Sequence, residues 1–251
     1  MNFKDHFSGH SDLYLKARPH YPDALFAWVA AQAPSRGCAW DAGCGNGQAS
    51  VALAKHFGRV IATDPSEKQI GNAVVDPRVE YRNEPAEHTS IEARSVDAIT
   101  VAQALHWFDL PAFVAEARRV AKPGALFAVW CYANCNVTPA VDAVIAHLYD
   151  DILGGYWSPE RRLVDGGYAS LDIPFVPVAT PALEMRVDWN VHQLLAYLTS
   201  WSAAQKYTRA TDQDSVAAVA DELVEAWDGA ERIRPVRWDL AMRAGRVASH
   251  V

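Results

Sequence analysis

Short apolar segments alternate with helix-like segments through the first half of the chain. The apolar segments are CAW at 38–40, RVIAT at 59–63, RVEYR at 78–82, SVDAITVA at 95–102 and ALFAVW at 125–130. Between them, residues 48–57 have helical spacing and end at Gly58, while residues 110–120 follow Asp109, a capping residue type, and end at KPG. Apolar strands separated by helices are typical of a parallel sheet covered on both faces. The pattern therefore predicts an α/β fold.

The pattern changes after residue 134. An amphipathic helix is expected at 141–148, and the aromatic, turn-rich segment 154–175 follows it. Segments 183–189 and 236–240 alternate apolar with polar residues, as half-exposed antiparallel strands do, and two further amphipathic helices are expected between them. Because neither a repeat nor a low-complexity linker interrupts the chain, we expect one domain over residues 1–251, with an inserted substrate cap at 134–182.

Charge and composition argue against several classes of partner. The 251 residues are half apolar and carry a formal net charge of −7, without a run of lysine or arginine. Binding to a nucleic-acid backbone relies on clustered cations, so we expect no nucleic-acid partner. The longest apolar run, 125–133, is far too short to cross a bilayer, and the N-terminus lacks a signal-peptide core. We therefore expect a cytoplasmic protein with no membrane partner.

The cysteines indicate neither a metal site nor disulfides. Cys38, Cys44, Cys131 and Cys135 show no paired spacing of the kind that binds zinc. In a cytoplasmic protein such residues are expected to stay as reduced thiols, and we expect no bound metal. The oligomeric state is left open.

The stretch DAGCGNGQAS, Asp41 to Ser50, lies between the first expected strand and the first expected helix, where open α/β sheets bind ligands. Its glycines, Gly43, Gly45 and Gly47, let the backbone turn with positive φ and approach a cofactor. A dinucleotide loop has the spacing G-x-G-x-x-G, whereas this loop is G-x-G-x-G and begins with an acid. Asp41 would repel a pyrophosphate but attract the ammonium and sulfonium of S-adenosylmethionine. Charge therefore favours this methyl donor over NAD.

Asp64 ends the second expected strand, where an acidic side chain can accept hydrogen bonds from ribose hydroxyls. NAD would use the same interaction, so Asp64 indicates an adenosine moiety without choosing between the two cofactors. The alternative is that Asp64 only caps a helix beginning near Ser66. The glycine loop at the right distance upstream favours the ribose role.

Several motifs now point to one enzyme family. They are Asp41–Gly47, Asp64, PAEHTS at 85–90, SVDAITVAQALHWFD at 95–109 and EARRVAKPGALFAVW at 116–130. Together they resemble the class I S-adenosylmethionine-dependent methyltransferases of type 11. YLKARPHYP at 14–22, AQALHWFD at 102–109 and YLTSWSAAQKY at 197–207 are similar to the trans-aconitate methyltransferase-like branch. The resemblance implies a Rossmann-like sheet of seven mostly parallel strands with helices on both faces. The last pair of strands includes a reversed one, which is consistent with the two alternating segments.

The resemblance also implies a donor site. Its residues would be Asp41, Gly43, Cys44, Gly45, Gly47, Asp64, Pro65, Ala86, Glu87, Gln103 and Ala104. The glycine loop would line the methionine end, with Asp41 facing the ammonium through the loop or a water, and Asp64 would hold the ribose. Residues 86–87 would border the adenine, although Glu87 could instead be a surface acid at a helix start. Residues 103–104 would lie near the methionine and the methyl group.

Methyl transfer from a sulfonium needs donor, methyl and acceptor held collinear and dry, without a metal or a covalent nucleophile. His106 is the residue near the expected methyl position that could act as a base, and it is the candidate catalytic residue. A carboxylate acceptor has no proton to remove. We therefore favour a His106 that lines the pocket and orients the acceptor over one that acts as a general base.

The candidates for the acceptor site are aromatic or cationic. Three of them, Tyr14, Arg18 and Tyr21, belong to a segment that folds over the cofactor in similar proteins. Arg18 could pair with a carboxylate of donor or substrate, or could form only a surface salt bridge. The remaining candidates are Trp130, Tyr156, Trp157, Arg161, Arg162 and Trp201.

We therefore expect an enzyme that transfers a methyl group from S-adenosylmethionine to a small molecule, on a carboxylate oxygen if the branch resemblance holds. Residues 102–105 are AQAL, where methylases of DNA bases or glutamine carry Asn/Asp-Pro-Pro-Tyr, which argues against those acceptors. The alternatives are an NAD-dependent oxidoreductase and a non-catalytic module that binds S-adenosylmethionine, because a fold alone does not prove turnover.

Overall fold

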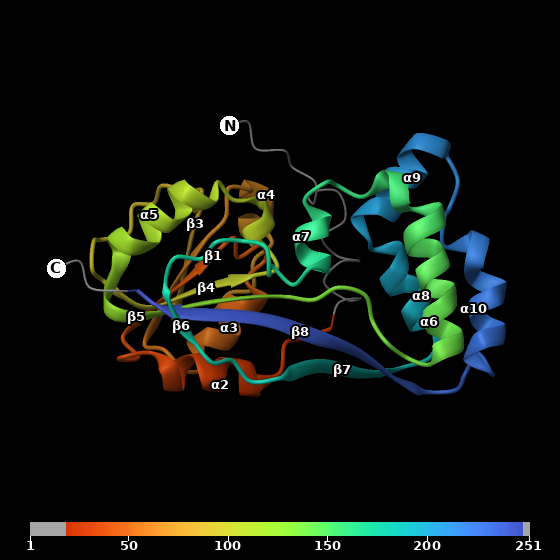
Figure 1. Cartoon of the computed structure of the whole chain (residues 1–251), viewed down its shortest axis with the longest axis horizontal. Helices are drawn as coiled ribbons and strands as arrows, with labels where there is room; N and C mark the ends of the chain where they lie inside the picture. The colour runs from red at the N-terminus through yellow and green to blue at the C-terminus, as the bar shows by residue number, and fades with distance from the viewer. Residues whose placement is uncertain (1–18, 248–251) are drawn as a thin grey trace.

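The computed structural model describes residues 19–247, and Figure 1 shows a central sheet with helices on both faces. Within these residues eight strands join in the order β3-β2-β1-β4-β5-β8-β6, with β7 attached to β8. The parallel strands are β1 (Cys38–Ala42), β2 (Arg59–Thr63), β3 (Val79–Arg82), β4 (Val96–Ala102) and β5 (Ala121–Cys131). The others are β6 (Val176–Val178), β7 (Leu183–Trp189) and β8 (Arg234–Arg246), and β8 runs antiparallel to its three neighbours. The predicted α/β fold with a mostly parallel sheet is confirmed.

Apolar side chains on both faces of the strands explain why helices cover the sheet twice. In β4, for example, Ala98 packs into one buried core and Ile99 into the other. Helices α2 (Asp23–Gln32) and α3 (Gln48–Ala54) cover one face, and α5 (Leu110–Val120) covers the opposite face, with the short α4 (Glu67–Gly71) after β2 (Figure 1). Asp109 caps α5 as expected, since its carboxylate accepts the N–H of Ala112 at 3.2 Å.

The pairing of strand β8 differs most from what the sequence pattern predicted. Residues 234–240 pair with β7, whereas residues 241–246 pair with β5 and, on the other edge, with β6. The two alternating segments therefore pair with each other, and only the second continues into the central sheet. Close packing requires a small residue at position 245, because a Cβ on Gly245 would lie 2.7 Å from the Cβ of Phe175. The edge position belongs to β6, which lies inside the segment expected to be a cap.

A second group of helices lies beside the sheet, at the far end of β7 and β8 (Figure 1). Its members are α6 (Pro139–Ala146), α8 (Val191–Thr199), α9 (Ser202–Thr211) and α10 (Ala220–Trp227). Shorter helical turns complete the chain: η1 (Leu105–Trp107), η2 (His147–Ile152), η3 (Gly154–Tyr156), α7 (Arg161–Asp165) and η4 (Ala217–Val219). Segment 134–182 therefore supplies only part of this helical group, because α8, α9 and α10 follow it in the chain. Neither α2 nor α9 was expected.

The described residues, 19–247, contain no helix that is both long and apolar enough to span a membrane.

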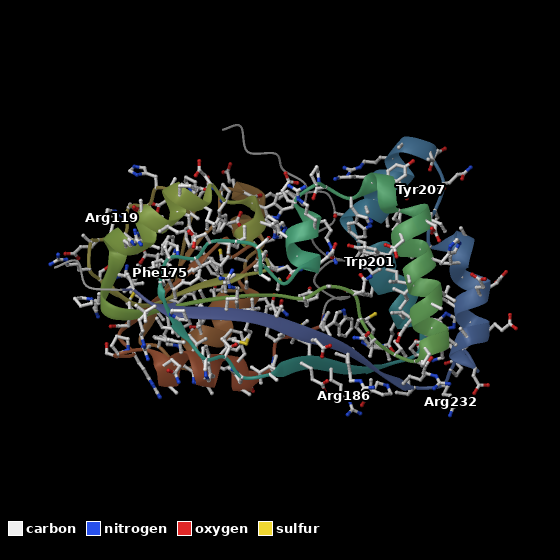
Figure 2. All side chains as sticks on the ribbon, viewed as in Figure 1. Arg119, Phe175, Arg186, Trp201, Tyr207 and Arg232 are labelled. Atoms are coloured by element: carbon white, nitrogen blue, oxygen red, sulfur yellow. The ribbon has the colours of Figure 1, made fainter. Side chains whose placement is uncertain are left out.

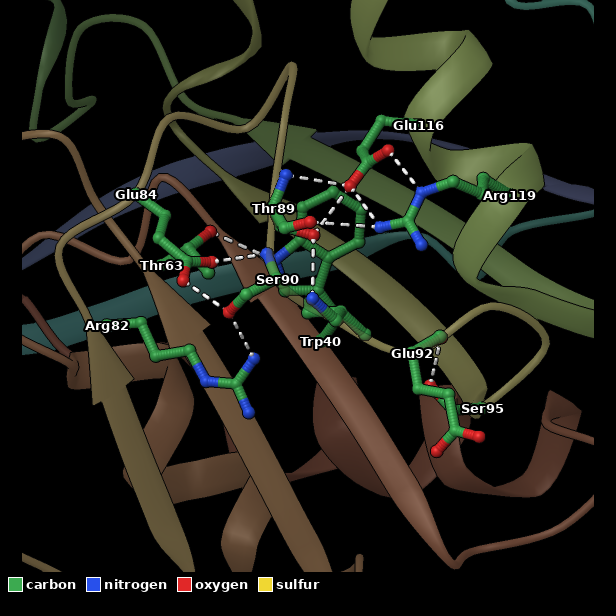
Figure 3. A network of polar contacts seen from close by, with 11 residues as sticks. Trp40, Thr63, Arg82, Glu84, Thr89, Ser90, Glu92, Ser95, Glu116 and Arg119 are labelled. Atoms are coloured by element: carbon green, nitrogen blue, oxygen red, sulfur yellow. Dashed lines mark hydrogen bonds and ion pairs between the residues drawn. The ribbon is translucent and has the colours of Figure 1, made fainter.

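A buried carboxylate ties the loop after β3 to helix α5. Glu116 is 5% exposed and accepts hydrogen bonds from the backbone N–H and the hydroxyl of Thr89, at 2.8 and 2.6 Å (Figure 3). Arg119 pairs with the same carboxylate at 2.6 Å. Burial by itself would raise the pKa of Glu116, but the hydrogen bonds from Arg119 and Thr89 outweigh it and hold the pKa below its usual value. The loop that carries residues 86 and 87 is therefore anchored to α5.

We expect Glu116→Gln to lower the free energy of unfolding by about 2 kcal/mol at pH 7, because Arg119 loses its charged partner and one acceptor oxygen becomes a donor. A group with a lowered folded pKa stabilises the protein above its unfolded pKa, and this contribution is lost as the pH falls through the folded pKa. The difference between the two proteins should therefore shrink in acid. Urea unfolding measures it, with Glu92→Gln as the exposed control; equal effects of the two substitutions would contradict the assignment.

Candidate functional site

A cavity of about 1460 Å³ opens where the parallel strands end and faces the second group of helices. The residues that follow each parallel strand line it: 43–46 after β1, 64–66 after β2, 85–87 after β3, 103–104 after β4, and Tyr132 after β5. Pockets for single small molecules usually measure about 300–1,000 Å³. This cavity is therefore large enough for a nucleoside cofactor and a second small molecule.

The three loop glycines all have positive φ, but the space around each one differs. A Cβ on Gly43 (φ +68°) would lie 2.7 Å from the Cβ of Ala104, and a Cβ on Gly47 (φ +85°) would lie 2.0 Å from the hydroxyl oxygen of Tyr81. Gly45 (φ +55°) has no atom within 4 Å of such a Cβ, and it lines the cavity. Gly43 and Gly47 are thus required by packing as well as by φ. Of the three glycines, only Gly45 has open space where a side chain would start; Gly43 also lines the cavity, and Gly47 does not.

Asp64 holds the glycine loop in place. One carboxylate oxygen accepts the N–H of Gly45 at 2.9 Å, and the other accepts the N–H of Ser66 at 2.9 Å. Helix α4 is capped by Ser66 itself, whose hydroxyl accepts the N–H of Gln69 at 3.3 Å. Asp64 therefore does not cap α4; it joins the glycine loop to the start of that helix, and it lines the cavity.

Asp41 lies beneath the loop and does not line the cavity. Its side chain is fully buried, and its carboxylate accepts hydrogen bonds from the hydroxyls of Ser50, at 2.6 Å, and Thr100, at 3.1 Å. Burial raises the pKa of Asp41 to about 6, although both hydroxyls oppose the shift. Asp41 can therefore act on a cavity ligand only through the loop.

The other expected donor-site residues, Cys44, Pro65, Ala86, Glu87, Gln103 and Ala104, all line the cavity. Glu87 does not begin a helix; its carboxylate accepts the backbone N–H of Asp109 at 2.8 Å. Gln103 has a left-handed backbone (φ +56°), and its amide both donates to the carbonyl and accepts from the N–H of Tyr132, at 3.0 and 2.9 Å. These two side chains thus fix the backbone of neighbouring cavity segments.

Most of the described acceptor-site candidates line the cavity: Tyr21, His106, Tyr156, Trp157, Arg161 and Trp201. Figure 2 shows Trp201 in the second group of helices. Trp130 was expected in the acceptor site, but it does not line the cavity. It is fully buried and packs edge-on against Tyr21 and Phe26 in the core between the sheet and α2. Arg162 points into solvent and does not line the cavity. Tyr14 and Arg18 lie outside the described residues.

The structure adds cavity residues that the sequence did not single out. Phe108 lies inside the recognised stretch 95–109, and Tyr132 lies two residues after the stretch 116–130, so their position in the chain could have indicated them. Gln48, whose amide donates to the carbonyl of Pro19 at 3.1 Å, begins the helix after the glycine loop. Lys206 lies on α9, inside the stretch 197–207 that resembles the trans-aconitate branch, so that stretch could have indicated it.

His106 lies on the turn η1, directly after the β4 end. Its Nδ1 is 2.8 Å from the hydroxyl of Tyr168, and its ring packs against Trp107 at a tilt of 46°, with 4.6 Å between centroids. Burial of the ring, with a smaller contribution from the charge of Arg161, lowers the pKa of His106 to about 3. The imidazole is therefore neutral at physiological pH and is a weak base.

Comparison with known proteins decides the family. Residues 40–129 match the family of the methyltransferase domain. A protein of Dictyostelium discoideum named as a methyltransferase is 33% identical over 247 residues, which are 96% of this chain and 94% of its own. This chain belongs to the methyltransferase family. A yeast protein, from Saccharomyces cerevisiae, is named as an S-adenosylmethionine-dependent methyltransferase and is 30% identical over 59% of this chain and 56% of its own.

A solved structure agrees with this methyltransferase over nearly its whole length. The structure, described as a type II methyltransferase from Anaeromyxobacter dehalogenans, is 48% identical, covers 93% of this chain and 99% of its own, and has a TM-score of 0.87. The methyl donor of the enzyme is S-adenosylmethionine, as the loop spacing and Asp41 predicted. The cavity fits this group, since open space above Gly45 adjoins an acidic side chain at the end of β2. The NAD-dependent alternative is not supported.

The different surroundings of Gly45 and Gly47 predict different losses of stability when each is replaced by alanine. We expect Gly47→Ala to lower the free energy of unfolding by more than about 2 kcal/mol, because it combines left-handed strain with a collision against Tyr81. Gly45→Ala carries the strain alone and should cost about 1 kcal/mol. Urea denaturation of both variants measures the difference. If Gly45→Ala were the more damaging, or if Tyr81→Ala failed to relieve Gly47→Ala, the packing explanation would be wrong.

Proposed function

We propose that this methyltransferase methylates a carboxylate oxygen of a small molecule, in keeping with its resemblance to the trans-aconitate methyltransferase-like branch. In this proposal Asp64 accepts hydrogen bonds from the ribose of S-adenosylmethionine, and residues 86–87 border its adenine. The methionine end lies along Gly45 and residues 103–104. Asp41, beneath the loop, supplies negative charge close to the ammonium. The cavity position of the four loop segments supports this placement.

The main support for a carboxylate acceptor comes from the contacts of Arg161. Its Nε donates to Asp165 and to the hydroxyl of Tyr149, both at 2.9 Å, and its guanidinium lies 4.9 Å from the ring centre of Trp157. The two Nη groups make no hydrogen bond within residues 19–247, and Arg161 lines the cavity. A guanidinium held by one edge presents the planar donor pair that matches a carboxylate.

The protonation state of His106 also favours a carboxylate. A lone pair of the carboxylate attacks the methyl carbon, the oxygen–carbon bond forms as the carbon–sulfur bond breaks, and the electron pair stays on sulfur. The products are a methyl ester and S-adenosylhomocysteine, and one negative and one positive charge are neutralised without transfer of a proton. A phenol or ammonium acceptor would have to lose a proton, and an imidazole with a pKa of about 3 is poorly suited to take it.

Aromatic residues at the end of η3 and at the start of α9 supply the apolar part of the proposed acceptor site. Tyr156, Trp157 and Trp201 line the cavity, and Trp157 packs 5.6 Å from Trp201 between ring centres. We therefore extend the substrate cap expected at 134–182 to include the start of α9. Aromatic walls exclude water around the transferring methyl group, which in-line displacement requires.

Transfer of labelled methyl from S-adenosylmethionine to a panel of small acids, trans-aconitate included, with phenols and amines alongside, tests the proposal. We expect a base-labile, ester-linked label on an acid. Arg161→Gln should lower kcat/KM for that acid at least about tenfold, the loss expected for a charged hydrogen bond. Arg162→Gln, one residue along the same helix and outside the cavity, is the matched control. Label on phenols or amines, or none on any acid while donor binding is intact, would overturn the proposed acceptor.

The raised pKa of Asp41 predicts how donor binding depends on pH. Ionised Asp41 attracts the ammonium and sulfonium of the donor, whereas protonated Asp41 does not. Donor affinity should therefore rise several-fold from pH 5 to pH 7, as Asp41 ionises around pH 6. Calorimetric titration of the wild type and Asp41→Asn measures this effect. The variant keeps the side-chain size and should bind more weakly at pH 7 with little dependence on pH; an unchanged pH dependence would exclude Asp41 as its source.

A further inference from the structure

Tyr168 is held in a conformation that large residues rarely adopt. Its φ is +59°, in the left-handed region, and its side chain is 1% exposed. The N–H of Tyr168 donates to the carbonyl of Leu163 at 2.8 Å, and Arg243 of β8 donates to the carbonyl of Tyr168 at 2.6 Å. The same guanidinium nitrogen also donates to the carbonyl of Leu171 at 2.6 Å. A left-handed tyrosine locked by its surroundings is the kind of strain that accumulates at functional sites.

This conformation brings the phenol of Tyr168 to His106. The hydroxyl lies 2.8 Å from Nδ1, and the two rings are inclined by only 28° with 6.0 Å between their centres. Burial raises the pKa of Tyr168 far above its usual range, so the hydroxyl keeps its proton. Within residues 19–247, the contact with Nδ1 is the only hydrogen bond that this hydroxyl makes. If Nδ1 carried a hydrogen and donated it, the phenol proton of the buried Tyr168 would have no acceptor among these residues, which is unfavourable. The phenol therefore donates its proton to Nδ1 of His106.

A neutral imidazole that accepts a hydrogen bond at Nδ1 carries its own hydrogen on Nε2. Nε2 makes no hydrogen bond to any residue in the described part of the chain, and His106 lines the cavity together with Arg161. The ring therefore presents a donor, not a lone pair, to whatever occupies the cavity beside Arg161.

We propose that Tyr168 is a positioning residue that fixes the tautomer of His106, so that Nε2–H donates a hydrogen bond to the acceptor carboxylate next to Arg161. This arrangement explains why a phenol, and not a phenyl ring, is buried at position 168. It also assigns His106 to recognition of the acceptor instead of proton removal. The tautomer is independent of the acceptor; only its use on a carboxylate rests on the proposed function.

The tautomer can be read directly by nitrogen NMR of the full chain with ¹⁵N-labelled histidine, in complex with S-adenosylhomocysteine. His106→Gln identifies the His106 signals by their loss. In the wild type we expect a protonated Nε2 and an unprotonated, hydrogen-bonded Nδ1. In Tyr168→Phe we expect Nδ1 to lose the hydrogen-bond signature and both tautomers to be populated. A proton on Nδ1 in the wild type would overturn the inference without any variant, and an unchanged pattern in Tyr168→Phe would do the same.

Kinetics with an acid that the enzyme methylates then test the role. Tyr168→Phe should lower kcat/KM about tenfold, and His106→Gln, whose amide N–H can replace the donor, should keep about tenfold more activity than His106→Ala. Equal loss in the two His106 variants would remove the donor role. If no acid is methylated while the NMR result holds, the proposed acceptor fails and the tautomer assignment stands. If the NMR result fails, the inference fails whatever the acceptor is.

Discussion

Two carboxylates hold the glycine loop from opposite sides, and the geometry of the site follows from them. Asp41 lies below the loop and joins β1 to Ser50 of α3 and Thr100 of β4, while Asp64 reaches the N–H of Gly45 from the end of β2. Between them the chain must turn through three residues with positive φ within five positions. The turn leaves the backbone at Gly45 facing open space. This open space therefore has one carboxylate below the loop and a second beside it.

Burial shifts the pKa values of Asp41 and His106 in opposite directions. Low-dielectric surroundings disfavour any charge, so they raise the pKa of the carboxyl of Asp41 and lower that of the imidazole of His106. The first group becomes sensitive to a nearby cation, and the second becomes a neutral hydrogen-bonding group. Such an arrangement suits methyl transfer from a sulfonium, in which opposite charges cancel and positioning contributes most to the rate.

The long strand β8 connects the two halves of the cavity. Its second half completes the central sheet and its first half pairs with β7 toward the second group of helices, as Figure 1 shows. Arg243, in the part that pairs with β5, also holds the carbonyl of Tyr168 and thereby the ring beside His106. Strand β8 therefore links the central sheet both to β7 and, through Tyr168, to the ring of His106.

Local patterns predicted the parallel strands, the glycine loop and the cap of α5 at Asp109, because each depends on neighbouring residues whose chemistry is visible in a short stretch. Charge in the loop favoured S-adenosylmethionine as the methyl donor, and the family resemblance of several motifs supported it. The location of β6, the pairing of β7 with β8 and the burial of Trp130 were decided only by tertiary packing. A tryptophan at a strand end can face a cavity or a core, and its sequence neighbourhood is the same in either case. The partnership of Tyr168 with His106 joins residues 62 positions apart through a left-handed backbone that no local signal requires. Long-range contacts of this kind set protonation states, because desolvation depends on everything that surrounds a group and not on its position in the chain.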